Sequence, residues 1–118
     1  MLLDAAHKVM KGSWAEDAAL RYLLDKGYEL IGRNRRAPYG ELDLWMKDGE
    51  AYVAVEVKQR RGERFGTPLE AITPKKIERM KASAIHLLER DDVSVRLEAV
   101  LVYGSERNHR IDHQALED

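Results

Sequence analysis

The chain of 118 residues contains no cysteine, which excludes disulfide bonds and metal sites built from thiolates. It also has no apolar run approaching the roughly 18 residues of a membrane-spanning helix. Residues 1–10 lack the apolar core and the cleavage site of a secretion signal. We therefore expect a cytoplasmic protein that does not contact a membrane.

Several catalytic patterns are missing as well. The four histidines are not spaced as zinc ligands or as a histidine-based nuclease site. There is no glycine-rich phosphate loop, Walker motif or nucleophile elbow. Zinc enzymes, nucleotide-driven enzymes and acyl transferases therefore have no support in the sequence.

The composition is that of a soluble globular protein, with 44% hydrophobic and 35% charged residues. The length is sufficient for one hydrophobic core and too short for two. We predict a single nuclease-like domain over residues 1–118. Its core spans 12–116, preceded by a leader (1–11) and ending in a short C-terminal tail.

Positive charge is concentrated in the middle of the chain. The net charge is −1 overall, so the protein is not a generally basic nucleic-acid binder. Residues 31–81, however, carry 12 Lys/Arg against 8 Asp/Glu, whereas the remainder carries 8 against 13. A phosphate backbone approaching the central segment would explain this distribution, and so would an ordinary solvated surface.

Hydrophobic periodicity predicts a helix, three strands, a second helix and a late strand. A capping-box pattern at 13–16 opens the first helix, and Gly27 ends it. Thr73-Pro74 opens the second helix. Residues 28–34 and 93–103 read as strands before and after the central pair. This order favours an α/β fold with a mixed central sheet flanked by helices.

Two short strings carry the chemistry, Gly40-Glu41-Leu42-Asp43-Leu44 and Glu56-Val57-Lys58. Both lie in alternating segments separated by the turn signal 47–50, which predicts a β-hairpin. A loop with an even number of residues puts Asp43 on the same face of the hairpin as Glu56 and Lys58. The other face then holds the apolar residues of both strands: Leu42, Leu44, Met46, Val53, Val55 and Val57. Opposite and diagonal neighbours across strands lie about 5–8 Å apart, a span that one cation can bridge.

Two carboxylates and a lysine on one face of a sheet are the residue types that a metal-dependent nuclease needs. Asp43 and Glu56 would hold Mg²⁺ or Mn²⁺, which activates water against a phosphodiester. Lys58 would steer that water or neutralise the phosphate. An exposed Glu–Lys ladder on a solvated sheet face is the alternative.

The same strings resemble the PD-(D/E)XK nuclease superfamily, and more narrowly the YraN-like family of small bacterial proteins, related in fold to archaeal Holliday-junction resolvases. Nearly the whole chain takes part in the resemblance. The matching segments are Gly12-x-x-Ala15-Glu16-x-x-Ala19-x-x-Tyr22-Leu23, Gly27-Tyr28, Arg33-Asn34, Gly40-Glu41-Leu42-Asp43-Leu44, Val55-Glu56-Val57-Lys58-Gln59-Arg60, Phe65-Gly66 and 111–116.

The resemblance implies a restriction-endonuclease-like αβββαβ core with Asp43, Glu56 and Lys58 as the motif residues. It also implies that Glu16 is a further metal or water ligand. A purely structural alternative for Glu16 is a capping-box bond to the amide of residue 13. The chain departs from the family in Ala15, where glycine is usual, and in Glu98, where aspartate is usual; the role of Glu98 stays open.

Other residues are candidates for supporting roles. The Val57 carbonyl would be an additional metal ligand. Glu41 is either a spare carboxylate or a partner for Arg33 or Arg35, and Gln59 and Asn34 are candidate polar supports. The candidate nucleic-acid contacts are the basic residues around the site: Arg33, Arg35, Arg36, Arg60, Arg61, Arg64, Lys75 and Lys76.

These features predict a metal-dependent endonuclease that hydrolyses DNA, with branched or junction structures as the expected substrate. Resolving a four-way junction requires two symmetric nicks, so that substrate predicts a homodimer. A nucleic-acid-binding module of the same fold without turnover is one alternative. A protein-interaction domain is the other.

Overall fold

The structure is a computed structural model that describes residues 14–60, 72–89 and 93–116. Its regular elements are the helices α2 (Trp14–Asp25) and α3 (Pro74–Leu88) and the strands β1 (Glu29–Ala37), β2 (Gly40–Asp48), β3 (Ala51–Arg60), β4 (Val95–Gly104) and β5 (His109–Ala115). The predicted leader (1–11) and residue 12, where the predicted core begins, lie outside the described residues.

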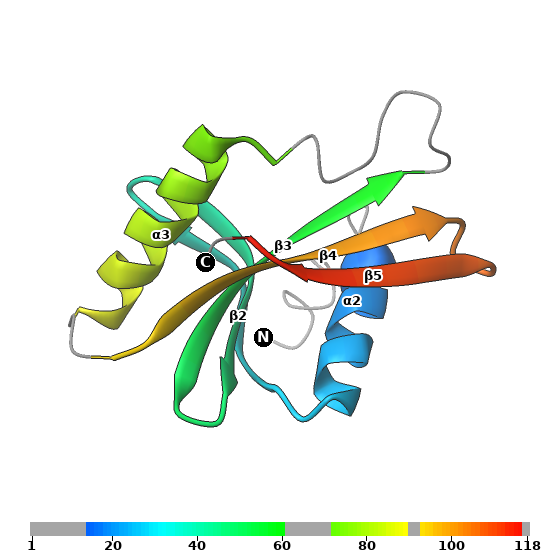
Figure 1. The fold of residues 1–118 in the computed structure, drawn as a ribbon, viewed down its shortest axis with the longest axis horizontal. Coiled ribbons are helices and arrows are strands. Elements are labelled where there is room, and N and C mark those ends of the chain that lie inside the picture. The colour runs from blue at the N-terminus through cyan, green and yellow to red at the C-terminus, as the bar shows by residue number, and fades with distance from the viewer. Residues whose placement is uncertain (1–13, 61–71, 90–92, 117–118) are drawn as a thin grey trace, which may run out of the picture.

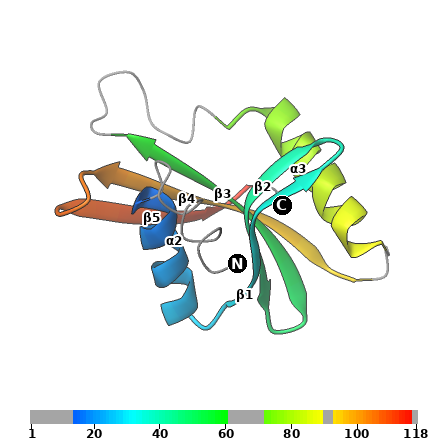
Figure 2. The same ribbon diagram turned by 180° about the vertical axis from the view of Figure 1, so that it is seen from behind.

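The strands form one twisted five-stranded sheet in the order β1-β2-β3-β4-β5. Strand β3 pairs with β4 in parallel, and the other three pairs are antiparallel. The two helices lie on either side of the sheet, with α3 as the crossover between β3 and β4 (Figures 1 and 2). This architecture confirms the predicted α/β class with a mixed sheet, and it is compatible with a restriction-endonuclease-like core.

The last strand of the sheet was not among the elements that the sequence pattern predicted. Residues His109–Ala115 form β5, which pairs along β4 from Gly104 to Glu98. The hydrophobic pattern of this segment is weak because β5 is an edge strand whose residues are half-buried or exposed. Backbone pairing with β4, rather than burial of apolar side chains, therefore defines it.

The helix ends follow the predicted signals. Gly27 has φ +102°, and the amide of Tyr28 donates to the carbonyl of Leu23 at 3.0 Å, which ends α2 in a Schellman-type turn. Thr73 caps α3 by accepting a bond from the Lys76 amide at 3.2 Å, with Pro74 in the first turn. Within the described residues, neither helix is long and apolar enough to cross a membrane.

Each face of the sheet packs against one helix. On the α2 side, Leu44, Met46, Val53, Val55, Val100 and Val102 contact Ala15, Ala19 and Leu23. On the α3 side, Trp45, Ala54 and Leu97 contact Met80 and Ala84. Leu42 belongs to this second cluster; the prediction that it shares the face of Leu44 and Met46 was wrong.

Candidate active site

The hairpin of β2 and β3 has the predicted even loop. Asp48 pairs with Ala51 and Leu44 with Val55, so the loop is the two residues 49–50. Gly49 has φ +64°, a conformation that glycine adopts without strain. This register directs Asp43 toward Glu56 rather than toward a valine.

The two strands separate where the acidic residues begin. The last paired rung is Leu44 with Val55. One residue beyond it, Oδ2 of Asp43 accepts a hydrogen bond of 2.8 Å from the backbone N–H of Val57. A side chain thus takes the place of a backbone acceptor, and the break in the ladder explains why Leu42 turns to the α3 side.

Glu56 is the most buried charged side chain of the site, with 3% of the residue exposed. Its Oε2 lies 3.7 Å from Nζ of Lys58, on the same strand, and 3.5 Å from Nζ of Lys76, on α3. Burying a carboxylate is unfavourable unless it is paired. The two lysines provide that compensation.

Glu16 reaches the site from the first turn of α2. Its Oε1 accepts a bond from Arg33 and its Oε2 one from Asn34, both at 3.2 Å. Asn34 has φ +48°, a left-handed conformation that asparagine tolerates better than most residues. The alternative capping bond of Glu16 involves residue 13, which lies outside the described residues.

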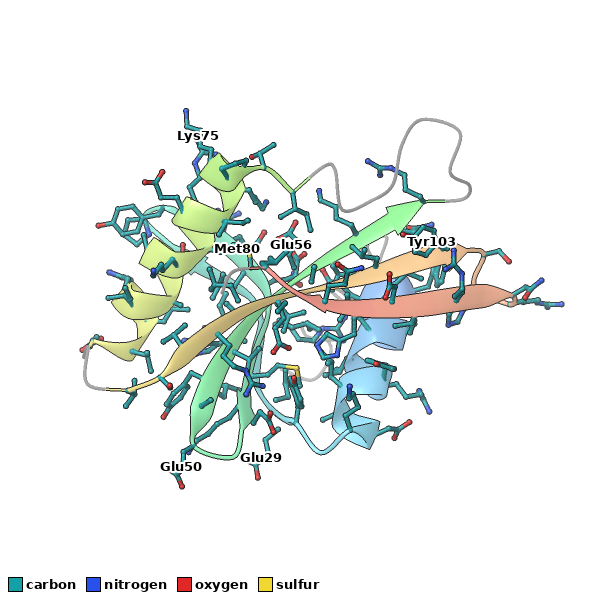
Figure 3. All side chains as sticks on the ribbon, in the orientation of Figure 1. Glu29, Glu50, Glu56, Lys75, Met80 and Tyr103 are labelled. Carbon is teal, nitrogen blue, oxygen red and sulfur yellow. The ribbon has the colours of Figure 1, made fainter. Side chains whose placement is uncertain are left out.

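These side chains line one cleft of about 340 Å³. Figure 3 shows Glu56 near the middle of the molecule, whereas Glu50 lies at the distant tip of the β2–β3 hairpin. The predicted acids and Lys58 are therefore brought together, along with Val57 and Gln59, and the ladder on an open sheet face is ruled out for Glu56. The lining residues are Ala15, Glu16, Asp43, Glu56, Val57, Lys58, Gln59 and Lys76.

Burial raises the pKa of Asp43 from its ordinary 3.8 to about 7, and the neighbouring charge of Glu56 adds to the rise. The Val57 N–H opposes it, Glu16 adds to it, and Lys76 weakly opposes it. Burial and the charge of Glu56 therefore both disfavour the ionised form of Asp43. A shared proton or an added cation would relieve this repulsion.

Asp43→Asn is expected to stabilise the metal-free protein at high pH. The unfolded chain ionises Asp43 near pH 3.8, while the folded chain keeps the proton to about pH 7, so wild-type stability declines across that window. Asparagine still accepts the Val57 bond and cannot ionise. The gain should be small at pH 4 and on the order of 3 kcal/mol at pH 8.

Urea unfolding in EDTA at both pH values measures this difference. Asp25→Asn, an exposed position at the end of α2, is the matched control and should show no comparable pH dependence. Equal stabilities of Asp43→Asn and wild type at pH 8 would contradict the raised pKa.

The donor set of the cleft suits a hard divalent cation. Carboxylate and carbonyl oxygens are the ligands that Mg²⁺ and Mn²⁺ prefer. The N–H and C=O of a strand residue point to the same neighbouring strand, so the Val57 carbonyl is directed toward the fork with Asp43. Across the described residues, however, no three Asp, Glu, His or Cys side chains are arranged to hold a metal as they stand.

The predicted basic residues are distributed unevenly around the cleft. Lys76 is inside it, whereas Lys75 is exposed on α3 and Arg36 is exposed on β1. Arg60 is exposed and donates to the carbonyl of Gln59 at 2.9 Å. Arg61 and Arg64 lie outside the described residues.

Arg33, one of the two arginines predicted as partners of Glu41, pairs with other acids. Arg33 pairs with Glu16 at 3.2 Å and with Asp17 at 3.0 Å. Arg35 lies over Gly32, where an added Cβ would come within 2.8 Å of its side chain. Glu41 lines a neighbouring pocket that it shares with Lys76.

A second polar cluster surrounds Glu98, whose role the sequence left open. Oε1 of Glu98 accepts a bond of 2.8 Å from the Tyr28 hydroxyl and lies 2.7 Å from Nε2 of His113. Oε2 accepts a bond of 3.1 Å from Arg96, which also reaches Asp48 at 2.6 Å. The cluster joins β2, β4, β5 and the turn that follows α2; its members have no sequence spacing that could have revealed it.

Comparison with known proteins finds one family and many similar sequences. The model of the uncharacterised protein family UPF0102 matches residues 15–112. A UPF0102 protein of Thermus thermophilus is 58% identical over 108 residues, which cover 92% of this chain and 96% of the relative. UPF0102 proteins of Nocardia farcinica (40% identical, 96% and 92% covered) and Shewanella loihica (36%, 88% and 93%) are also similar.

Proposed function

The chain belongs to the uncharacterised protein family UPF0102, and from the geometry of its cleft we propose that it is a divalent-cation-dependent nuclease that hydrolyses DNA phosphodiesters. The observation that carries this proposal is the convergence of Asp43, Glu56 and Lys58 in one cleft at the fork of β2 and β3. Burial and mutual repulsion of two carboxylates are costly for stability, and functional sites are where such costs are usual.

Each residue has a distinct role in this mechanism. Asp43 and Glu56 would hold Mg²⁺ or Mn²⁺, with the Val57 carbonyl as a further ligand and Glu16 as a ligand to metal or water. A cation held there would supply Lewis acidity and lower the pKa of a water molecule. The Val57 N–H keeps the Asp43 carboxylate oriented. Lys58 neutralises charge that develops on the phosphate, and because it is on the same strand as Glu56 its position is fixed by that strand.

The substrate is held by the basic residues outside the cleft. Arg36, Arg60 and Lys75 are exposed and available to contact phosphates, so binding weakens as salt rises. We propose branched or four-way-junction DNA as the substrate because of the resemblance to junction resolvases. That substrate requires two cuts related by symmetry and therefore a homodimer.

Wild-type protein is expected to cut labelled DNA with Mn²⁺ or Mg²⁺ and to leave it intact in EDTA. Lys58→Met should lower kcat about 100-fold while KM changes little, because the lysine acts on charge that develops in the transition state. Linear, flapped and four-way-junction substrates, compared by gel electrophoresis, measure both the activity and the preference.

Lys47→Met is the matched control, since Lys47 lies over the ring of Tyr52 near the hairpin turn and outside the cleft. Its cleavage should equal that of wild type. If Lys58→Met cuts as fast as wild type, Lys58 has no catalytic role.

A binding module without turnover is the second candidate function. It is favoured by the two lysines that already neutralise Glu56 and by the lack of a three-ligand metal geometry in the part of the chain that the structure describes. This candidate would shift junction DNA on a gel, with strong salt dependence, and leave every substrate uncut with either metal.

A further inference from the structure

Lys76 is a second lysine of the site that the Glu-x-Lys string does not contain. It lies in the first turn of α3, and its Nζ is 3.5 Å from Oε2 of Glu56. Lys58 approaches the same oxygen at 3.7 Å. One oxygen of a buried carboxylate thus has two ammonium groups, contributed by two different elements of the fold.

The position of Lys76 is unfavourable for a cation that serves only as a solvated surface charge. The first turn of a helix carries partial positive charge from its unpaired N–H groups. The first turn of α3 contains no acidic residue of its own. The Lys76 ammonium is therefore compensated from the sheet, by Glu56.

The side chain of Lys76 also borders a second pocket. Besides the cleft, it lines an adjoining pocket of about 70 Å³ formed with Tyr39, Arg79 and Met80. The four-carbon stem of lysine is flexible, and 37% of the Lys76 side chain is exposed. Its ammonium group can leave Glu56 and stay at the edge of the site.

We propose that Lys76 occupies the place of the divalent cation on Glu56 until the metal binds, and that the metal displaces it toward the substrate phosphate. An ammonium and a divalent cation on the same oxygen repel each other, so each binds at the expense of the other. This inference rests on the proposed function for the metal and the phosphate. It adds that Lys76 weakens metal binding while it contributes a positive charge to the loaded site.

Titration calorimetry with Mn²⁺ alone, without DNA, tests the competition. Lys76→Met is expected to bind Mn²⁺ about fivefold more tightly than wild type, because one competitor is removed. Lys76→Arg keeps the charge and should bind as wild type does. Lys75→Met removes the same charge from the adjacent, exposed position and should change the Mn²⁺ affinity by less than about twofold.

The inference is overturned if Lys76→Met and wild type bind Mn²⁺ equally, if neither binds it, or if Lys75→Met tightens binding as much as Lys76→Met. DNA cleavage is scored separately. A wild type that binds Mn²⁺ but cuts no DNA would contradict the proposed nuclease activity. The calorimetry would still decide whether Lys76 weakens metal binding.

Discussion

Glutamine in place of Glu56 is expected to reduce metal-dependent cleavage by at least about 1,000-fold, because the metal site would lose a charged ligand. The same change should leave the protein folded. Glutamine fills the same space, and the loss of one negative charge relieves the repulsion that adds to the effect of burial on the pKa of Asp43. An inactive protein that is at least as stable as wild type is the signature of a functional rather than a structural carboxylate.

Glu50→Gln is the matched control, since Glu50 is exposed in the two-residue turn of the same hairpin (Figure 3). Cleavage rates and urea unfolding in EDTA should be measured for both variants. Full activity in Glu56→Gln would refute the proposed site. A large loss of stability would instead assign Glu56 a structural role through its lysines.

Alanine in place of Glu98 is expected to destabilise the protein by about 3 kcal/mol, because the buried Tyr28 and the half-buried His113 lose their acceptor. Tyr28, Arg96 and His113 all direct polar atoms to this carboxylate. Glu98→Gln keeps one side-chain oxygen that can accept two hydrogen bonds. It should lower the free energy of unfolding by about half as much as Glu98→Ala. Since the cluster is separate from the cleft, the Mn²⁺ affinity of the folded protein should not change.

The pH dependence gives this prediction a second readout. Burial raises the pKa of Glu98, but the hydrogen bonds from His113 and Tyr28 outweigh it and hold the pKa below its ordinary 4.5. Glu98 therefore contributes stability above about pH 4.5 that is lost as the pH falls through the lower, folded value. Urea unfolding from pH 3 to 7 should show a weaker acid dependence in Glu98→Gln.

Glu29→Ala, at the exposed start of β1, is the matched control and should change stability by less than about 0.5 kcal/mol. A loss of less than about 1 kcal/mol in Glu98→Ala would mean that water replaces the carboxylate at little cost. The cluster would then not be a determinant of stability.

Local signals in the sequence were sufficient for most of the fold and for the acids of the site. The turn at Gly49 fixed the parity of the hairpin, and with it the side on which Asp43 meets Glu56. Thr73 and Pro74 located the start of α3, and the glycine at 27 located the end of α2. In each case the decisive interaction lies within a few residues along the chain.

Long-range pairing was beyond the sequence pattern. Strand β5 is defined by backbone bonds to β4, and the partners of Glu98 come from segments as far apart as Tyr28 and His113. The prediction of which face of the sheet Leu42 occupies was wrong for a related reason. Strict alternation assumes an intact ladder, and the ladder between β2 and β3 ends at Leu44 because Asp43 bonds to the backbone.

That bond between Asp43 and the Val57 amide makes one peptide group a built-in reporter of the site. In most of β3, amide protons are bonded to carbonyls of neighbouring strands, whereas this one depends on a carboxylate that can gain a proton or a metal. Its proton chemical shift and its rate of exchange with deuterium therefore follow the state of the carboxylate. A single backbone resonance can register occupancy of the site without any substrate.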